Sequence, residues 1–265
     1  MLYWLEIAQF AARGWIALSK LGRTMNIRLL VGTVGAVAVM AGGAQAAQLI
    51  TNGGFETGTF AGWTPNVEAG SGGNLYIAAN NGGPSPQSGF PTQFNPAGGN
   101  FYAITDQGGA GSYSLTQSFT LASASKVTVS FQMFANDQAG VIFDNGRDYN
   151  TIPNQNAEAD ILVGGADPFT NAPADIVSVL YGPGADNLAG NPNPWTSYSS
   201  TLNLAAGAYQ IRFAETDNQF FFQMGVDNVS VTTAGVPEPA AWAMMLVGFG
   251  GLGALARRRR TAVAA

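Results

Sequence analysis

Hydrophobic and polar residues alternate over short stretches in the middle of the chain. In the stretch KVTVSFQMF (126–134), every second residue from Val127 to Met133 is apolar, and the residues between them are polar. The stretch GAYQIRFAE (207–215) alternates in the same way. A period of two residues is typical of a β-strand with one buried face. No long segment has the 3.6-residue spacing of an amphipathic helix, so the pattern predicts strands.

Several further stretches have the composition and length of strands, and Gly, Pro and Asn clusters such as YGPGADN and GNPNP separate them. These stretches are 111–121, 159–163, 175–181, 195–204 and 225–231. Many short strands joined by turns are typical of two packed antiparallel sheets. We therefore predict an all-β fold over residues 47–235, an antiparallel β-sandwich of the jelly-roll type.

The N-terminal part of the chain has a different pattern. Residues 25–46 combine Arg28, an apolar run over 29–40 and the small residues Ala44 and Ala46, which predicts a signal peptide for the Sec machinery. The mature chain would then begin near Ala47. Residues 1–24 are either a long N-terminal extension of that signal or a start assigned too early, with Met25 as the initiator. An amphipathic N-terminal helix in the mature protein would require an uncleaved signal.

The C-terminal part is also apolar. Residues 240–256 carry no charge, and a helix of this length just crosses a thin hydrocarbon core. Four arginines follow, which keep that end of a membrane helix in the cytoplasm. Two prolines with Glu238 between them precede the run and hold the chain extended. Residues 236–260 resemble the PEP-CTERM sorting signal of Gram-negative bacteria, through Pro237, Glu238, Pro239, Trp242, Arg257, Arg258, Arg259 and Arg260.

That resemblance implies a cellular route for the protein. It implies recognition by a membrane exosortase, with the body in the periplasm and the C-terminal helix in the inner membrane before processing. After processing, the body would reach the cell surface or the extracellular space. Proteins with such signals are associated with bacteria that make exopolysaccharide, so a polysaccharide is an expected partner.

The composition excludes several classes of function. The chain has no cysteine and no histidine, which removes thiol nucleophiles, the Ser-His-Asp triad and the usual zinc ligands. Residues 47–236 carry 14 acidic and three basic side chains, a net charge of −11. Such a surface repels phosphate backbones, so we expect no binding of nucleic acid. It favours hard cations such as calcium, which bind oxygen ligands.

The two edges of the predicted domain carry a second resemblance. LITNGGFETGTFAGWT (49–64) and FFFQMGVDNVSV (220–231) resemble the first and last segments of galactose-binding-like jelly rolls, including carbohydrate-binding modules. The resemblance implies a structural calcium ion held by Glu56 and Asp227. Alternation with Val229 and Val231 places Asp227 on the side where those valines are buried, and a buried carboxylate needs a partner. The alternative is a solvated Asp227 at the start of its strand.

Aromatic side chains are candidates for binding a sugar ring. Trp63, Trp195 and Phe220 could each stack on a ligand, although aromatic residues of a sandwich mostly form its core. Three consecutive phenylalanines at 220–222 cannot all face one core, so at least one should be exposed or meet a second sheet.

The resulting expectation is an exported surface or matrix protein with a non-catalytic sandwich that binds carbohydrate. The alternative is an extracellular glycosidase or lyase that uses two carboxylates. A binding module should present exposed aromatic rings, whereas such an enzyme should present two acids facing each other across a cleft.

Overall fold

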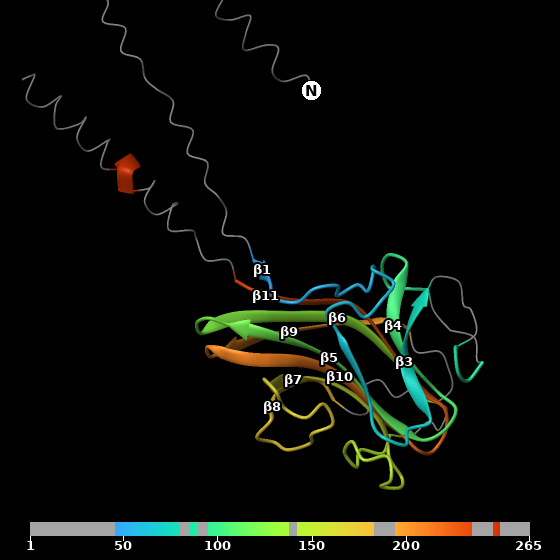
Figure 1. Ribbon diagram of the computed structural model, residues 1–265. Coiled ribbons are helices and arrows are strands. Elements are labelled where there is room, and N and C mark those ends of the chain that lie inside the picture. The colour runs from blue at the N-terminus through green and yellow to red at the C-terminus, as the bar shows by residue number, and fades with distance from the viewer. Residues whose placement is uncertain are drawn as a thin grey trace, which may run out of the picture. The chain divides into compact units, whose positions relative to one another are not determined.

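A computed structural model of the chain describes residues 46–79, 85–89, 95–137, 142–182, 194–234 and 246–249. Within these residues the chain forms two antiparallel sheets, which lie one above the other in Figure 1. This arrangement confirms the predicted all-β sandwich. The predicted signal helix and the predicted membrane helix lie outside the described residues, apart from one helical turn at 246–249. In the described part of the chain, no helix is long and apolar enough to cross a membrane.

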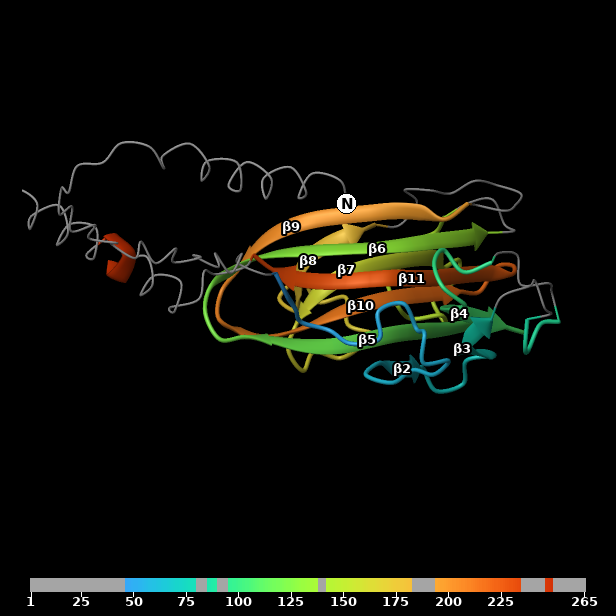
Figure 2. The same ribbon diagram turned by 90° about the horizontal axis from the view of Figure 1, so that it is seen from above.

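The first sheet contains the last strand of the domain at its centre. Its strand order is β3-β4-β11-β6-β9, and β1 also pairs with β11. Figure 2 shows β9, β6 and β11 side by side along the sheet. The bounds are β1 (Ala47–Gln48), β3 (Gly73–Ala79), β4 (Phe101–Gln107), β6 (Ser125–Asp137), β9 (Thr196–Leu204) and β11 (Phe222–Thr233).

The second sheet has the order β2-β5-β10-β7-β8. Its strands are β2 (Thr64–Val67), β5 (Gly111–Leu121), β7 (Gln155–Val163), β8 (Ile176–Tyr181) and β10 (Gly207–Asp217). Between β4 and β7, and again between β8 and β11, each strand lies in the opposite sheet from the one before it. This alternation between sheets is a feature of jelly-roll connectivity.

The apolar core lies between the two sheets and follows the predicted alternation. Val127, Val129, Phe131 and Met133 of β6 are at most 2% exposed. Phe131 packs edge-on against Phe213 of β10, with ring centroids 5.0 Å apart. Burial of these side chains removes a large apolar surface from water, which is the main contribution to the stability of such a sandwich.

The outer face of β10 is buried as well, because the segment after β7 covers it. Gln210 donates to the carbonyl oxygen of Ala166, and Arg212 donates to that of Thr170 at 2.7 Å. Arg212 also forms a bidentate ion pair with Asp160, through Nε to Oδ1 at 3.0 Å and Nη2 to Oδ2 at 2.5 Å. Arg147 pairs with Glu158 on the same face. These charges are therefore paired, as burial requires.

Four strands continue beyond their predicted limits at one end of the sandwich. Strand β6 extends to Asp137, β7 begins at Gln155, β10 extends to Asp217 and β11 begins at Phe222. Asp217 pairs with Gln155, and Phe222 pairs with Asp137, so the extensions lie together. We call this end, formed by residues 105–107, 135–137, 155–158 and 215–224, the polar end. At the opposite end Ala47 pairs with Thr233, so both edges of the domain leave the sheet there.

Candidate functional site

The segment before β2 packs closely against β11. The carbonyl oxygen of Gly53 accepts a hydrogen bond from Val229 N at 2.9 Å, and a Cβ at Gly53 would overlap the carbonyl oxygen of Val229. Phe55 is fully buried, and its ring lies 5.5 Å from that of Trp63. The Asn-Gly-Gly-Phe-Glu motif therefore combines a close backbone approach at Gly53 with an apolar anchor at Phe55.

Glu56 and Asp227 both bind the loop at 97–101. Oε1 of Glu56 accepts hydrogen bonds from Asn100 N at 2.8 Å and Phe101 N at 3.1 Å, and these donors lower the pKa of Glu56. Oδ2 of Asp227 accepts one from Gly98 N at 3.0 Å. Burial raises the pKa of Asp227 to about 6, and the charge of Glu56 adds to the rise. The two carboxylates are thus close enough for the charge of one to affect the other.

Asp227 is fully buried, but it lies on the opposite face of the sheet from the one predicted. The strand pairing shifts between Asp227 and Ser230, and Asn228 has a left-handed backbone (φ 51°). This β-bulge reverses the alternation, because one extra residue moves all later side chains to the other face. Asp227 therefore pairs with the outward-facing Gln132, whereas Val229 and Val231 lie in the core.

The oxygen atoms near Gly54 fit a calcium ion in their chemistry. A Cβ at Gly54 would lie 3.7 Å from Asn228 Oδ1 and 3.9 Å from Asp227 Oδ1, with Glu56 Cγ also at 3.7 Å. The described residues contain no group of three or more Asp, Glu, His or Cys side chains that could hold a metal. Two carboxylates would thus need amide or carbonyl oxygens as further ligands, which calcium accepts.

Two of the three candidate aromatic residues are packed against other side chains. Trp63 is 5% exposed in the core, and its indole N–H donates to Asn52 O at 3.1 Å. Trp195 is half-buried on the outer face of the first sheet, edge-on to Phe134 at 4.7 Å. Neither ring offers a free face comparable to that of Phe220, which is 66% exposed. The next two phenylalanines differ from it, since Phe221 is half-buried and Phe222 is fully buried.

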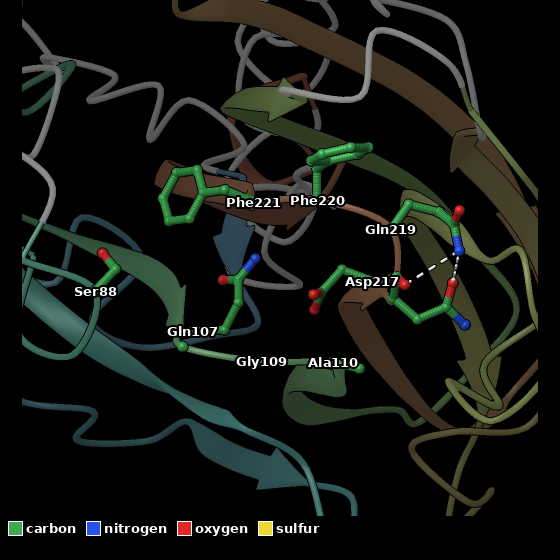
Figure 3. A pocket seen from close by; sticks show the side chains of 10 residues that line it. Ser88, Gln107, Gly109, Ala110, Asp217, Gln219, Phe220 and Phe221 are labelled. Carbon is green, nitrogen blue, oxygen red and sulfur yellow. Dashed lines mark hydrogen bonds between the residues drawn. The ribbon is translucent and has the colours of Figure 1, made fainter.

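A pocket of about 330 Å³ lies beside Phe220 at the polar end. The β4–β5 turn and the β10–β11 turn form its walls. Figure 3 shows the Asp217 carboxyl and the Gln107 amide directed into it, with Phe220 and Phe221 along another side. The lining residues are Ser88, Gln107, Gly108, Gly109, Ala110, Asp217, Asn218, Gln219, Phe220 and Phe221.

Carboxyl groups are buried in and behind this pocket. Asp217 is 3% exposed, and burial raises its pKa to about 8, although a hydrogen bond from Gln107 opposes the rise. Glu215 is fully buried two residues earlier on the same face of β10; burial, and then the charge of Asp217, raise its pKa. The hydroxyl of Thr105 donates to Glu215. Burial therefore favours the protonated form of Asp217 in the folded protein.

Sequence reasoning did not identify Gln107, Asp217 or Glu215, although a signal for the two acids was present. In β10 the core-facing residues are Tyr209, Ile211 and Phe213, and the same alternation continues to positions 215 and 217. Two acids at positions that the pattern assigns to a core indicate either a buried partner or a site. Gln107 gave no such signal, because its strand was not predicted.

The predicted sorting residues lie outside the described residues. This applies to Pro237, Glu238, Pro239, Trp242 and Arg257 to Arg260.

Solved structures with a similar arrangement include carbohydrate-binding modules and other domains. The carbohydrate-binding module TmCBM61, solved with β-1,4-galactotriose, has 12% identity and a TM-score of 0.42, covering 70% of this chain and 97% of its own. A cyclase from Fischerella sp. TAU has 17% identity and a TM-score of 0.46, covering 72% and 100%. The K3 adhesin domain of Lys-gingipain from Porphyromonas gingivalis w83 has 16% identity and a TM-score of 0.44, covering 71% and 99%.

Sequence comparison identifies the C-terminal segment. No curated protein matches the chain significantly. The family model described as the PEP-CTERM protein-sorting motif matches residues 235–260. This agrees with the resemblance drawn from the Pro-Glu-Pro, the apolar run and the arginines. The chain carries a PEP-CTERM protein-sorting motif, which implies export and processing by an exosortase.

Proposed function

We propose that the sandwich is the non-catalytic, carbohydrate-binding part of an exported cell-surface or matrix protein. The pocket at the polar end is the observation that carries this proposal. Its volume of about 330 Å³ is at the lower end of the range for small-ligand sites. A pocket of this size suits one or two sugar units of a polysaccharide rather than a long buried chain.

The chemistry of the lining supports a sugar ligand. Phe220 presents an exposed ring, which can pack against the apolar face of a sugar. Gln107 and Asp217 lie below it, and each has a buried oxygen atom without a hydrogen-bond partner among the described residues. Leaving such atoms unpaired costs free energy, and the hydroxyl groups of a bound sugar would pair them.

The position of the pocket also supports this role. Strand β11 runs from Phe222 beside the pocket to Thr233, and the sorting motif begins at residue 235. At about 3.3 Å per residue, this strand places the pocket tens of ångströms from the start of the motif. A sandwich held near a membrane or surface through that end would leave the pocket accessible to polysaccharide.

The test is a binding measurement with the full-length protein, purified in mild detergent, on a panel of bacterial and plant polysaccharides. Affinity electrophoresis would identify a ligand, and calorimetry would give its dissociation constant. Phe220→Ala should weaken binding by about two- to tenfold, because a stacked ring contributes about 0.5–1.5 kcal/mol. The control Val179→Ala removes an exposed apolar side chain on β8 and should bind like wild type. Equal binding by Phe220→Ala would exclude this pocket.

The raised pKa of Asp217 favours one other function, because glycosidases use a protonated carboxyl as their general acid. Such an enzyme also needs an ionised carboxylate across the cleft, and Asp217 is the one acid among the residues that line the described pocket. Incubation of the bound polysaccharide with the protein would decide. Release of reducing ends that is lost in Asp217→Asn would establish an enzyme in place of a binding module.

We further propose that calcium binds between Glu56 and Asp227 as a structural ion. Asp227 Oδ1 and Asn228 Oδ1 lie near Gly54 together with Glu56 Cγ, and the negative charge of Glu56 helps to raise the pKa of Asp227. A divalent cation would offset that repulsion. The ion would join the first segment of the domain to its last strand.

A further inference from the structure

The pocket at the polar end has unused hydrogen-bond acceptors. Gln107 Oε1 and Asp217 Oδ1 have no hydrogen-bond partner among the described residues, and both side chains are 97% buried (3% exposed). Behind them, Glu215 Oε1 is also buried without a partner in the described part of the chain. A ligand that enters this pocket therefore meets oxygen atoms that need donors.

The three side-chain amide nitrogens of the lining each donate a hydrogen bond within the protein. The side-chain nitrogen of Gln107 donates to Phe222 O, and that of Asn218 donates to Tyr149 O at 2.6 Å. The side-chain nitrogen of Gln219 donates to Asn218 O at 3.1 Å. The amide side chains of the pocket thus offer a ligand more acceptors than donors.

Within residues 47–236, no basic side chain reaches these acceptors. Residues 47–236 contain three basic side chains, all of which are described. Arg147 pairs with Glu158 and Arg212 with Asp160 on the outer face of the second sheet. Lys126 is exposed in β6, near Thr233 at the other end of the sandwich. The acceptors of the polar end are therefore left for a ligand.

We infer that the pocket selects an amino sugar with a free, protonated amine over neutral and N-acetylated sugars. This inference rests on the proposed function and names the ligand class for the same site. An ammonium group has three N–H donors and a positive charge, so it can pair Asp217 and Gln107 together. Its charge would also favour the ionised form of Asp217, which burial otherwise disfavours. The ring of Phe220 would pack against the sugar.

Three matched oligosaccharides test this inference with the full-length protein. They are the β-1,4-linked tetramers of glucosamine, N-acetylglucosamine and glucose, compared by calorimetry at one pH and physiological salt. We expect the glucosamine tetramer to bind at least about tenfold tighter than the other two, since charge-assisted hydrogen bonds are the stronger ones. In Asp217→Asn this preference should fall to about one.

Two controls separate this selectivity from attraction to an acidic surface. Asp167→Asn makes the same exchange at an exposed carboxylate in the segment after β7, and should keep the full preference. A short lysine oligomer supplies amines without a sugar and should bind more weakly than the glucosamine tetramer. The inference would be overturned if Asp167→Asn also lost the preference for the glucosamine tetramer. It would also be overturned if the lysine oligomer bound as tightly as that tetramer.

The outcomes distinguish this inference from the proposed function. Equal affinity for all three tetramers would overturn amine selectivity and leave carbohydrate binding intact. Failure to bind the glucosamine tetramer would also overturn it. Binding to the polysaccharide panel would then decide the proposed function separately, because that test does not depend on an amine.

Discussion

Asp217 combines two properties that a surface carboxylate does not have. It is 3% exposed at the end of a core-facing row, and it lines a pocket that reaches solvent. Burial without a cationic partner disfavours its charged form, so it keeps its proton to about pH 8. A protonated carboxyl can donate to a sugar hydroxyl, and an ionised one can bind an amine. The same side chain thus serves the proposed function and the further inference.

This property of Asp217 predicts a pH-dependent stability. In the unfolded chain Asp217 loses its proton near pH 4, whereas the folded protein holds it to about pH 8. Between these values the folded state binds more protons, so the free energy of unfolding falls as pH rises. Asp217→Asn has no proton to lose at this position, so this fall in the free energy of unfolding should be absent from the variant. The free energy of unfolding of Asp217→Asn should exceed that of wild type by an amount that grows from pH 5 to pH 8 and reaches the order of a few kcal/mol.

Urea denaturation at a series of pH values would measure this difference. Asp167→Asn, which makes the same exchange at an exposed position, is the control for a general effect of removing a carboxylate. If Asp217→Asn and wild type gave parallel stability profiles, the folded protein would not hold the proton at Asp217.

At the scale of elements, the first segment of the domain depends on one of two adjacent glycines. A Cβ at Gly53 would overlap the carbonyl group of Val229, whose N–H donates to the carbonyl oxygen of Gly53 itself. A Cβ at Gly54 would meet its nearest atoms at 3.7 Å, an ordinary contact. Gly53→Ala should therefore lower the free energy of unfolding by about 2–4 kcal/mol, and Gly54→Ala by about 0.5 kcal/mol or less.

Each of these variants is the control for the other, because both make the same change in composition and lie side by side. Urea denaturation at neutral pH measures both. Equal stability of the two would mean that the segment does not approach β11 as closely as the structure has it.

The strands illustrate what the sequence could predict and what it could not. The alternation over 126–134 and 207–215 located β6 and β10 and their core-facing residues. The alternation of apolar and polar residues stops before the strands do at the polar end, where the buried positions hold Asp137, Gln155 and Asp217 instead of apolar residues. Hydrophobic periodicity cannot follow a strand whose buried side chains are polar. Asp217, which lines the pocket, lies in one of these missing strand ends.

The two candidate sites also differ in how far the sequence could predict them. Glu56 and Asp227 could be placed together by their resemblance to the edges of a known fold, although alternation assigned Asp227 to the wrong face because the bulge at Asn228 is not visible in the pattern. The pocket joins the turn at 108–110 to the turn at 218–221. These segments are more than 100 residues apart, and neither contains a motif that would indicate their contact.

At the scale of the whole domain, the first and last segments are joined at two places. Ala47 pairs with Thr233 at one end of β11, and Gly53 pairs with Val229 beside the bulge. Glu56 and Asp227 lie next to that second contact and bind the same loop. A calcium ion there would tie together segments that are about 170 residues apart in sequence, and it would stabilise the folded state in which they meet.

Calcium should therefore raise the melting temperature of the full-length protein. An ion that binds the folded state alone stabilises it by about 2.7 kcal/mol at a hundredfold excess over its dissociation constant. For a domain of this size the expected shift is about 5–10 °C, reversed by a chelator. Glu56→Gln and Asp227→Asn should each remove most of the shift, because calcium needs the charged oxygens. Asp167→Asn, whose carboxylate lies elsewhere, should retain it. A shift in melting temperature that survived in both Glu56→Gln and Asp227→Asn would place calcium at another site. If calcium did not shift the melting temperature of wild type, Glu56 and Asp227 would hold the loop at 97–101 by hydrogen bonds alone.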